Sequence, residues 1–231
     1  MNKASALKRN LLIGLVFFSP LMLLMVRHFW EANYLVSSSY KLIFLVPIVY
    51  RVFFHKTSFK NSIKEGFSIK AFKKHFFKSL GLGLILASIY LAAYFLFKYF
   101  IDFIAIQERI DDLASINASN IILIGAYIIL INSLLEEFFW RGFLFNELNK
   151  FTSRIFAYLF TGIAFSFHHI MFIFDWFPLH FLALATLGLI GYAIILNYVF
   201  EKHKDLFSCW FIHIFGDIVQ IFIALKIFAI L

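Results

Sequence analysis

Long apolar runs, separated by short polar segments, make up most of the chain. Many of these runs approach the roughly 20 residues that an α-helix needs to cross a lipid bilayer. Backbone N–H and C=O groups in hydrocarbon must be paired within their own segment, so the runs predict helices rather than open strands. The ten-residue alternation typical of a transmembrane β-barrel does not appear in the sequence. The candidate spans are Leu11–Val26, Tyr40–Phe54, Leu80–Ile101, Asn120–Trp140, Ile155–Phe174, Leu179–Phe200 and Leu206–Ile223.

The composition supports a membrane protein, because 62% of the 231 residues are hydrophobic and only 15% are charged. A soluble domain carries about 25% charged residues, and a chain of this size lacks the polar surface to cover such an excess of apolar side chains. We therefore predict an all-α fold, a polytopic transmembrane helical bundle of about seven spans, in a single domain over residues 1–231. The first run also fits a secretory signal, but it continues past Pro20 without a cleavage pattern, which favours a retained span.

The net charge of +8 does not indicate nucleic-acid binding, because the basic residues flank the apolar runs. Basic residues in such places set membrane topology and attract anionic lipid. If the N-terminus is cytoplasmic, most of the 21 basic residues fall on the cytoplasmic side. The sequence thus predicts an N-in protein of the cell (inner or plasma) membrane, with anionic lipid and no nucleic acid among its partners.

The segment from Phe67 to Lys78 mixes aromatic and basic residues at roughly helical spacing. This pattern predicts a short interfacial amphipathic helix in the inner leaflet, with its Phe side toward the lipid. A plain basic loop is the alternative. The residues concerned are Phe72, Phe76 and Phe77, with Lys70, Lys73, Lys74 and Lys78.

Ionisable residues within apolar runs are energetically costly, so each is a candidate functional residue. In the fourth run, Glu137 and Arg141 are four residues apart with the acid first, the order that favours an ion pair on a helix. Glu136 points about 100° away from Glu137 and is expected to face another neighbour. A carboxylate left free there can exchange a proton during catalysis. The alternative is a buried ion-pair cluster that only orients helices.

Histidines occupy two later runs. His168 and His169 are adjacent, so on a helix they point in different directions, and spacing alone does not select one of them. His213 and Asp217 are four residues apart and share one helix face, with Gly216 leaving room for a close approach. A hydrogen-bonded structural histidine and a simple His–Asp clasp are the alternative interpretations.

Together these residues form three motifs: Glu136-Glu137-x-x-x-Arg141, Phe165-x-x-x-His169 and His213-x-x-x-Asp217. Their order and separation resemble the signature of the CAAX-protease and bacteriocin-processing (CPBP, or Abi) intramembrane endopeptidases. The resemblance covers about residues 120–219 and implies peptide-bond hydrolysis within the membrane.

By this resemblance, Glu136 is the general base that activates a water, and His169, rather than His168, assists it. His213 and Asp217 would stabilise the oxyanion. A carboxylate donates a hydrogen bond only when it is protonated. Asp217 is therefore either held neutral by burial or serves only to orient His213.

No cofactor is expected, although Glu136, His169 and His213 are acceptable zinc ligands and zinc remains an alternative. The sequence lacks the H-E-x-x-H pattern that indicates a zinc protease. The expected partner is a substrate, either a membrane protein or a peptide precursor. A non-catalytic scaffold or bacteriocin self-immunity protein of the same fold is the main alternative function. A proton-coupled carrier is another, but no inverted repeat supports it.

Overall fold

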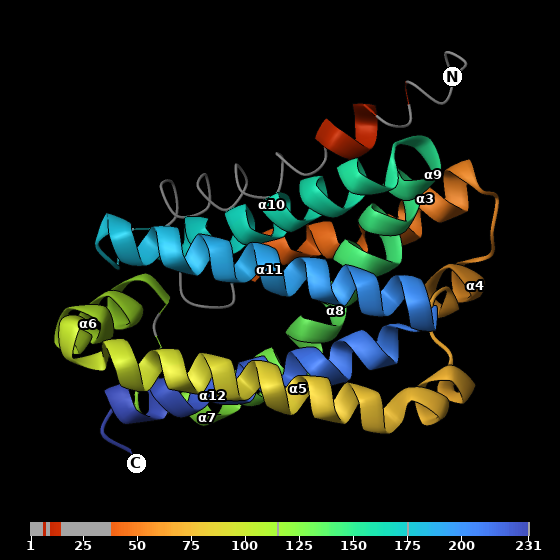
Figure 1. Ribbon diagram of the computed structural model, residues 1–231. Coiled ribbons are helices and arrows are strands. Elements are labelled where there is room, and N and C mark those ends of the chain that lie inside the picture. Colours follow the sequence, from red (N-terminus) through yellow and green to blue (C-terminus); the bar gives the residue numbers. More distant parts are fainter. Residues whose placement is uncertain (1–6, 8–9, 15–37, 115, 175, 231) are drawn as a thin grey trace.

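The computed structural model describes residues 7, 10–14, 38–114, 116–174 and 176–230. Every regular element within these ranges is a helix (Figure 1), which confirms the predicted all-α fold. The elements are η1 (Ser38–Leu45), α3 (Val46–Phe54), α4 (Phe59–Lys64), α5 (Ile69–Phe97), η2 (Lys98–Phe100), α6 (Phe103–Ala114), α7 (Ile121–Tyr127), η3 (Ile128–Asn132), α8 (Ser133–Phe139), η4 (Trp140–Phe145), α9 (Asn146–Phe151), α10 (Arg154–Ile173), α11 (Leu179–His203) and α12 (Leu206–Ile227).

Five helical stretches of the described residues are long and apolar enough to cross a membrane, and they coincide with the last five predicted runs. The predicted run Tyr40–Phe54 corresponds to a shorter apolar helix, Leu42–Phe53. The run Leu11–Val26 lies largely outside the described residues. The five stretches are Phe59–Phe100, Ile121–Phe151, Arg154–Ile173, Leu179–His203 and Leu206–Ile227.

The long helices pack in two pairs, α5 with α12 and α10 with α11, as Figure 1 shows. A glycine brings the first pair close together, since a Cβ atom at Gly83 would lie only 2.6 Å from the ring of Phe215. The segment Ser133–Phe145 joins the two pairs, because α8 contacts α12 while η4 contacts α10 and α11. This segment carries Glu136, Glu137 and Arg141, so the first motif lies between the two helix pairs.

The predicted interfacial helix is not a separate element. Residues Ile69–Phe97 form one continuous helix of 29 residues, α5, whose first turns contain the basic segment. Phe72 and Phe76 pack against Phe211 of α12, with ring centroids 5.6 and 5.4 Å apart, rather than facing lipid. Only Phe77 points outward, with 81% of its surface exposed. The expectation of a separate helix with a lipid-facing Phe side was wrong, because α12 covers most of that side.

The guanidinium of Arg51 ties the segment around α4 to the helix that bears the first motif. Its side chain is fully buried. It donates hydrogen bonds to the carbonyl oxygens of Ser62 at 2.9 Å and Gly142 at 2.5 Å, and its Nε lies 3.0 Å from a carboxylate oxygen of Glu65. A buried cation requires partners of this kind, because an unpaired charge is costly in a low-dielectric interior.

Candidate active site

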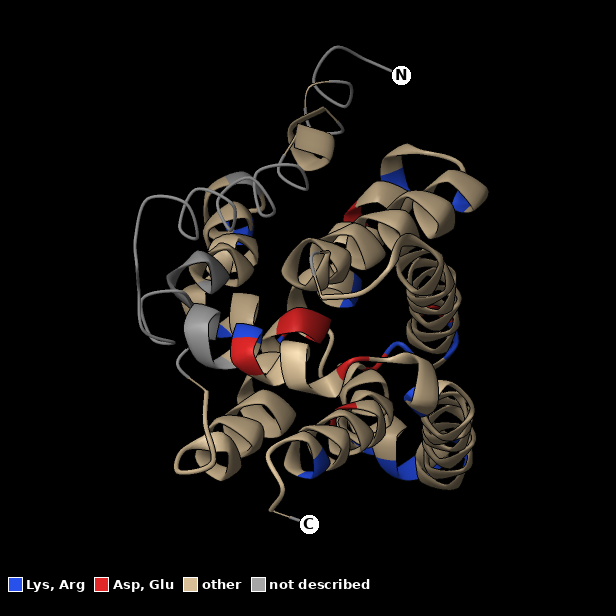
Figure 2. Cartoon of the chain, turned by 90° about the vertical axis from the view of Figure 1, so that its left-hand side faces the viewer, with Lys and Arg blue, Asp and Glu red and all other residues tan. Residues whose placement is uncertain are grey.

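The candidate acids lie in a helix that changes pitch twice. α8 is α-helical, whereas η3 before it and η4 after it are π-helical. Such wider turns occur frequently at functional sites. Figure 2, which views the long helices nearly end-on, shows acidic and basic segments adjoining near the middle of the bundle.

One carboxylate oxygen of Glu136 is fixed and the other is available. The side-chain amide of Asn132, the last residue of η3, donates a hydrogen bond to Oε1 of Glu136 over 2.5 Å. Oε2 of Glu136 is buried and has no hydrogen-bond partner among the described residues. The sequence suggested that Glu136 is wholly free, whereas the structure leaves only one of its oxygens free. The spacing of four residues between Asn132 and Glu136 was the signal that could have revealed this contact.

Glu137 forms the ion pair that its spacing from Arg141 predicts. Nη1 of Arg141 donates to Oε1 of Glu137 over 2.9 Å, and both side chains are fully buried. The same Oε1 atom lies 2.7 Å from Nδ1 of His213 on α12. A carboxylate that is paired with a guanidinium accepts hydrogen bonds, so Nδ1 of His213 carries the proton of this contact. Glu137 thus fixes both Arg141 and the ring of His213.

Phe165 holds the second motif together. Its carbonyl oxygen lies 2.8 Å from Nδ1 of His169. A carbonyl oxygen can only accept, so Nδ1 of His169 must carry the proton of this bond. The ring of Phe165 lies 4.2 Å from the ring of His169 and 4.4 Å from the guanidinium of Arg141, a cation–π distance. The aromatic residue of the motif therefore aligns His169 with the ion pair of the first motif.

The three motifs meet at Oε2 of Glu136. Nε2 of His169 lies 3.4 Å from this oxygen, and Nε2 of His213 lies 3.9 Å from it. Both histidines have their Nδ1 atoms engaged elsewhere, so each turns the opposite nitrogen toward the same carboxylate oxygen. His169 is the more accessible of the two, with 29% of its side chain exposed against 8% for His213.

His168 and Asp217 lie farther from this convergence. The ring of His168 packs between Phe44 and Trp140, with centroids 5.6 and 5.7 Å away. Oδ1 of Asp217 lies 3.7 Å from Nε2 of His213, outside hydrogen-bond distance, although both residues share one face of α12. The expected His–Asp clasp is therefore loose, and Glu137 rather than Asp217 is the close partner of His213.

Zinc would find donor atoms in Glu136, His169 and His213, and the engaged Nδ1 atoms are typical of metal-bound histidines as well. However, no group of three or more His, Cys, Asp or Glu residues in the described part of the chain is arranged to hold a metal ion.

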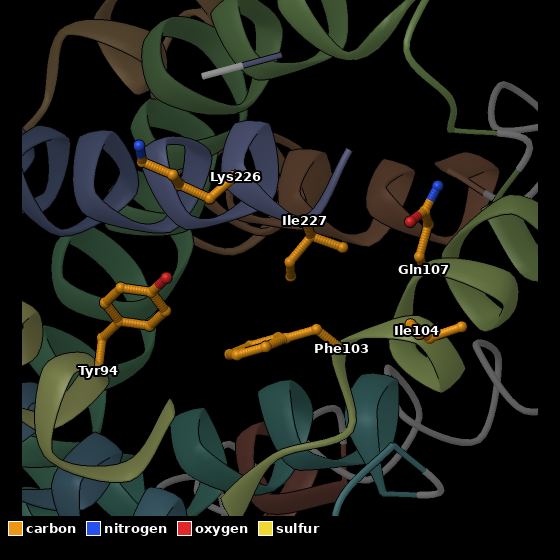
Figure 3. A pocket seen from close by; sticks show the side chains of 6 residues that line it. All are labelled: Tyr94, Phe103, Ile104, Gln107, Lys226 and Ile227. Atoms are coloured by element: carbon orange, nitrogen blue, oxygen red, sulfur yellow. The ribbon is translucent and has the colours of Figure 1, made fainter. Parts of the chain in front are cut away.

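A cavity of about 120 Å³ lies between α5, α6 and the end of α12 (Figure 3). Its lining contains no histidine and no acid, so it lacks groups for hydrolysis. The lining residues are Tyr94, Phe103, Ile104, Gln107, Lys226 and Ile227.

Residues 118–219 match the model of a protein family described as type II CAAX prenyl endopeptidase Rce1-like. Over these residues the chain is similar to the Rce1-like family. The match contains all three motifs and agrees with the CPBP resemblance predicted from the sequence. Together with the apolar helices, the Rce1-like match identifies an integral membrane protein and supports endopeptidase activity. Searches of curated proteins and of solved structures returned no significant match.

Proposed function

We propose that this protein hydrolyses a peptide bond of a membrane-associated protein or peptide precursor, using a water activated by Glu136 and His169. The observation that carries the proposal is the Oε2 atom of Glu136, which accepts no hydrogen bond from the described residues and faces Nε2 of His169 at 3.4 Å and Nε2 of His213 at 3.9 Å. Three polar groups from three helices, α8, α10 and α12, are directed at one point.

The position of the proton on the ring of His169 supports the proposed role of Glu136 and His169. Since Nδ1 donates to the carbonyl of Phe165, a neutral His169 presents a lone pair on Nε2. The ionised carboxylate of Glu136 also only accepts. A water between them donates one hydrogen to each, and this orients an oxygen lone pair toward an incoming carbonyl carbon. Such alignment of the reactants lowers the barrier by reducing the entropy that the reaction must lose.

The reaction then balances without a cofactor. Glu136 takes a proton from the water as the oxygen forms a bond to the carbonyl carbon, and the carbonyl oxygen becomes an oxyanion. The oxyanion collapses, the C–N bond breaks, and the proton held by Glu136 passes to the leaving nitrogen. The products are a carboxylic acid and an amine.

His213 is the proposed electrophile toward the oxyanion. Its Nδ1–H donates to Glu137, and a proton on Nε2 would face the reacting carbonyl. Glu137 and Arg141 are then positioning residues, because they fix His213 and do not touch the substrate. Asp217 is proposed to stabilise the imidazolium of His213.

We also propose that the protein lies in the cell membrane with a cytoplasmic N-terminus and that anionic lipid binds the first turns of α5. Four lysines of these turns are exposed, and basic residues near the membrane surface attract anionic headgroups. They are Lys70, Lys73, Lys74 and Lys78.

The experiment that tests the enzymatic proposal compares purified wild type, Glu136→Gln and Glu108→Gln in detergent micelles. The probe is a pooled library of quenched fluorescent peptides, with and without a prenylated C-terminal cysteine. Glu108 is exposed on α6, so its variant controls for the loss of an acid elsewhere. We expect cleavage by wild type and Glu108→Gln, and a loss of at least ~100-fold in Glu136→Gln. A folded wild type that cleaves nothing would support the non-catalytic scaffold or immunity function instead. An active Glu136→Gln would contradict the role of Glu136 as the general base.

A further inference from the structure

The hydroxyl group of Tyr192 on α11 is buried and has no hydrogen-bond partner among the described residues. Buried tyrosine hydroxyls usually find a partner, because burying an unpaired polar group costs free energy. An unpaired donor beside a candidate active site therefore requires an explanation.

The ring of Tyr192 is held by residues of the second and third motifs. Its centroid lies 5.8 Å from the ring of His213 in an edge-on arrangement and 6.4 Å from the ring of Phe165. A Cβ atom at Gly216 would lie 3.6 Å from the tyrosine oxygen. The hydroxyl thus lies against the turn of α12 between His213 and Asp217, and the absence of a side chain at Gly216 leaves space next to it.

The third motif is short of hydrogen-bond donors. Nδ1 of His213 is engaged by Glu137, which leaves Nε2 as the only donor that this histidine can offer. Asp217, when ionised, only accepts hydrogen bonds. A phenol is protonated at neutral pH, and tyrosine hydroxyls can act as oxyanion donors.

We propose that Tyr192 is a further catalytic residue, whose hydroxyl donates a hydrogen bond to the oxyanion formed on the scissile carbonyl, together with Nε2–H of His213. This inference rests on the proposed function. It gives the site two donors from two helices, α11 and α12, next to the turn of α12 that carries Gly216.

The first test compares Tyr192→Phe with Tyr198→Phe on the best-cleaved peptide of the fluorescent library. Tyr198 lies on the same helix with 52% of its surface exposed, so it is a matched control. Loss of one oxyanion donor typically lowers kcat by about 100-fold or more. We expect a loss of that size in kcat for Tyr192→Phe, with KM within about twofold of wild type, because the interaction forms only after water adds. Tyr198→Phe should match wild type.

A second measurement covers the case in which Tyr192→Phe folds poorly. Fluorinated tyrosine at position 192 keeps the ring and the hydroxyl but has a more acidic phenol. If Tyr192 donates to the oxyanion, the alkaline loss of kcat should begin at lower pH than in wild type.

An unchanged kcat in folded Tyr192→Phe, or an unchanged alkaline limb in the fluorinated protein, overturns the role of Tyr192. If Glu136→Gln is inactive in the same assay, that result leaves the proposed function standing. Failure of wild type to cleave any peptide overturns both.

Discussion

Nε2 of His169 lies 3.4 Å from Oε2 of Glu136, while the preceding residue, His168, turns its ring away toward Trp140. The two histidines are adjacent in sequence and differ by about 100° around the helix. Only one of them can form a hydrogen bond with the water that Glu136 activates.

We expect His169→Ala to lower the cleavage rate by at least ~100-fold, the lower end for loss of a general acid–base group. His168→Ala should keep most of its activity per folded molecule but should lower the folded yield, because it leaves a cavity beside Phe44 and Trp140. The rates should be measured on monodisperse protein at matched concentration. The opposite result, an inactive His168→Ala and an active His169→Ala, would contradict the proposed water site.

The Glu137–Arg141 pair should be critical for stability. Removal of one partner from a buried ion pair typically costs about 3–5 kcal/mol, because the other charge stays buried without compensation. We expect Arg141→Ala to lower the midpoint of thermal unfolding in detergent and the folded yield. Arg154→Ala is the control, since Arg154 forms its ion pair with Glu201 at an exposed position. Equal stability of these two variants would contradict the role assigned to Arg141.

The membrane topology can be tested by cysteine labelling. α4 and α6 lie at opposite ends of the bundle (Figure 1). We expect a cysteine at Gln107 to react with a membrane-impermeant reagent in intact cells, and a cysteine at Lys60 to react only after permeabilisation. The native Cys209 is buried, so it should give little background. Labelling of both positions from the same side would contradict the proposed span arrangement.

Treatment with a chelator distinguishes a mechanism in which Glu136 activates the water from one that depends on zinc. Purified protein treated exhaustively with a strong chelator should keep its cleavage rate, because the proposed mechanism uses only side chains of the chain. The assay should be repeated after added zinc. Loss of activity that only zinc restores would assign Glu136 and both histidines to ligand roles instead.

Much of the fold follows from local patterns. The apolar runs predicted the five long helices because hydrocarbon requires paired backbone groups, whatever the tertiary contacts are. The spacing of Glu137 and Arg141 likewise predicted their ion pair, since one helix presents both side chains on one face.

Contacts between helices were harder to predict. The pairing of His213 with Glu137 joins residues 76 positions apart, and periodicity within either helix says nothing about it. Phe72 and Phe76 were assigned to lipid because an aromatic face looks the same whether a bilayer or another helix covers it. Tyr192 gave no signal at all, because an aromatic residue in an apolar run is ordinary.

The buried Arg51 has a consequence for how the protein is made. The carbonyl of Gly142, one of its acceptors, comes 91 residues later in the chain. At about 5–20 residues per second, the ribosome supplies this acceptor roughly 5–20 s after Arg51. During that interval the guanidinium has Ser62 and Glu65 as partners but lacks the carbonyl of Gly142, so we expect the segment around α4 to reach its final packing only after the first motif has been synthesised. Nascent chains stalled before Gly142 should therefore expose residues 56–64 to protease, whereas the completed chain should protect them.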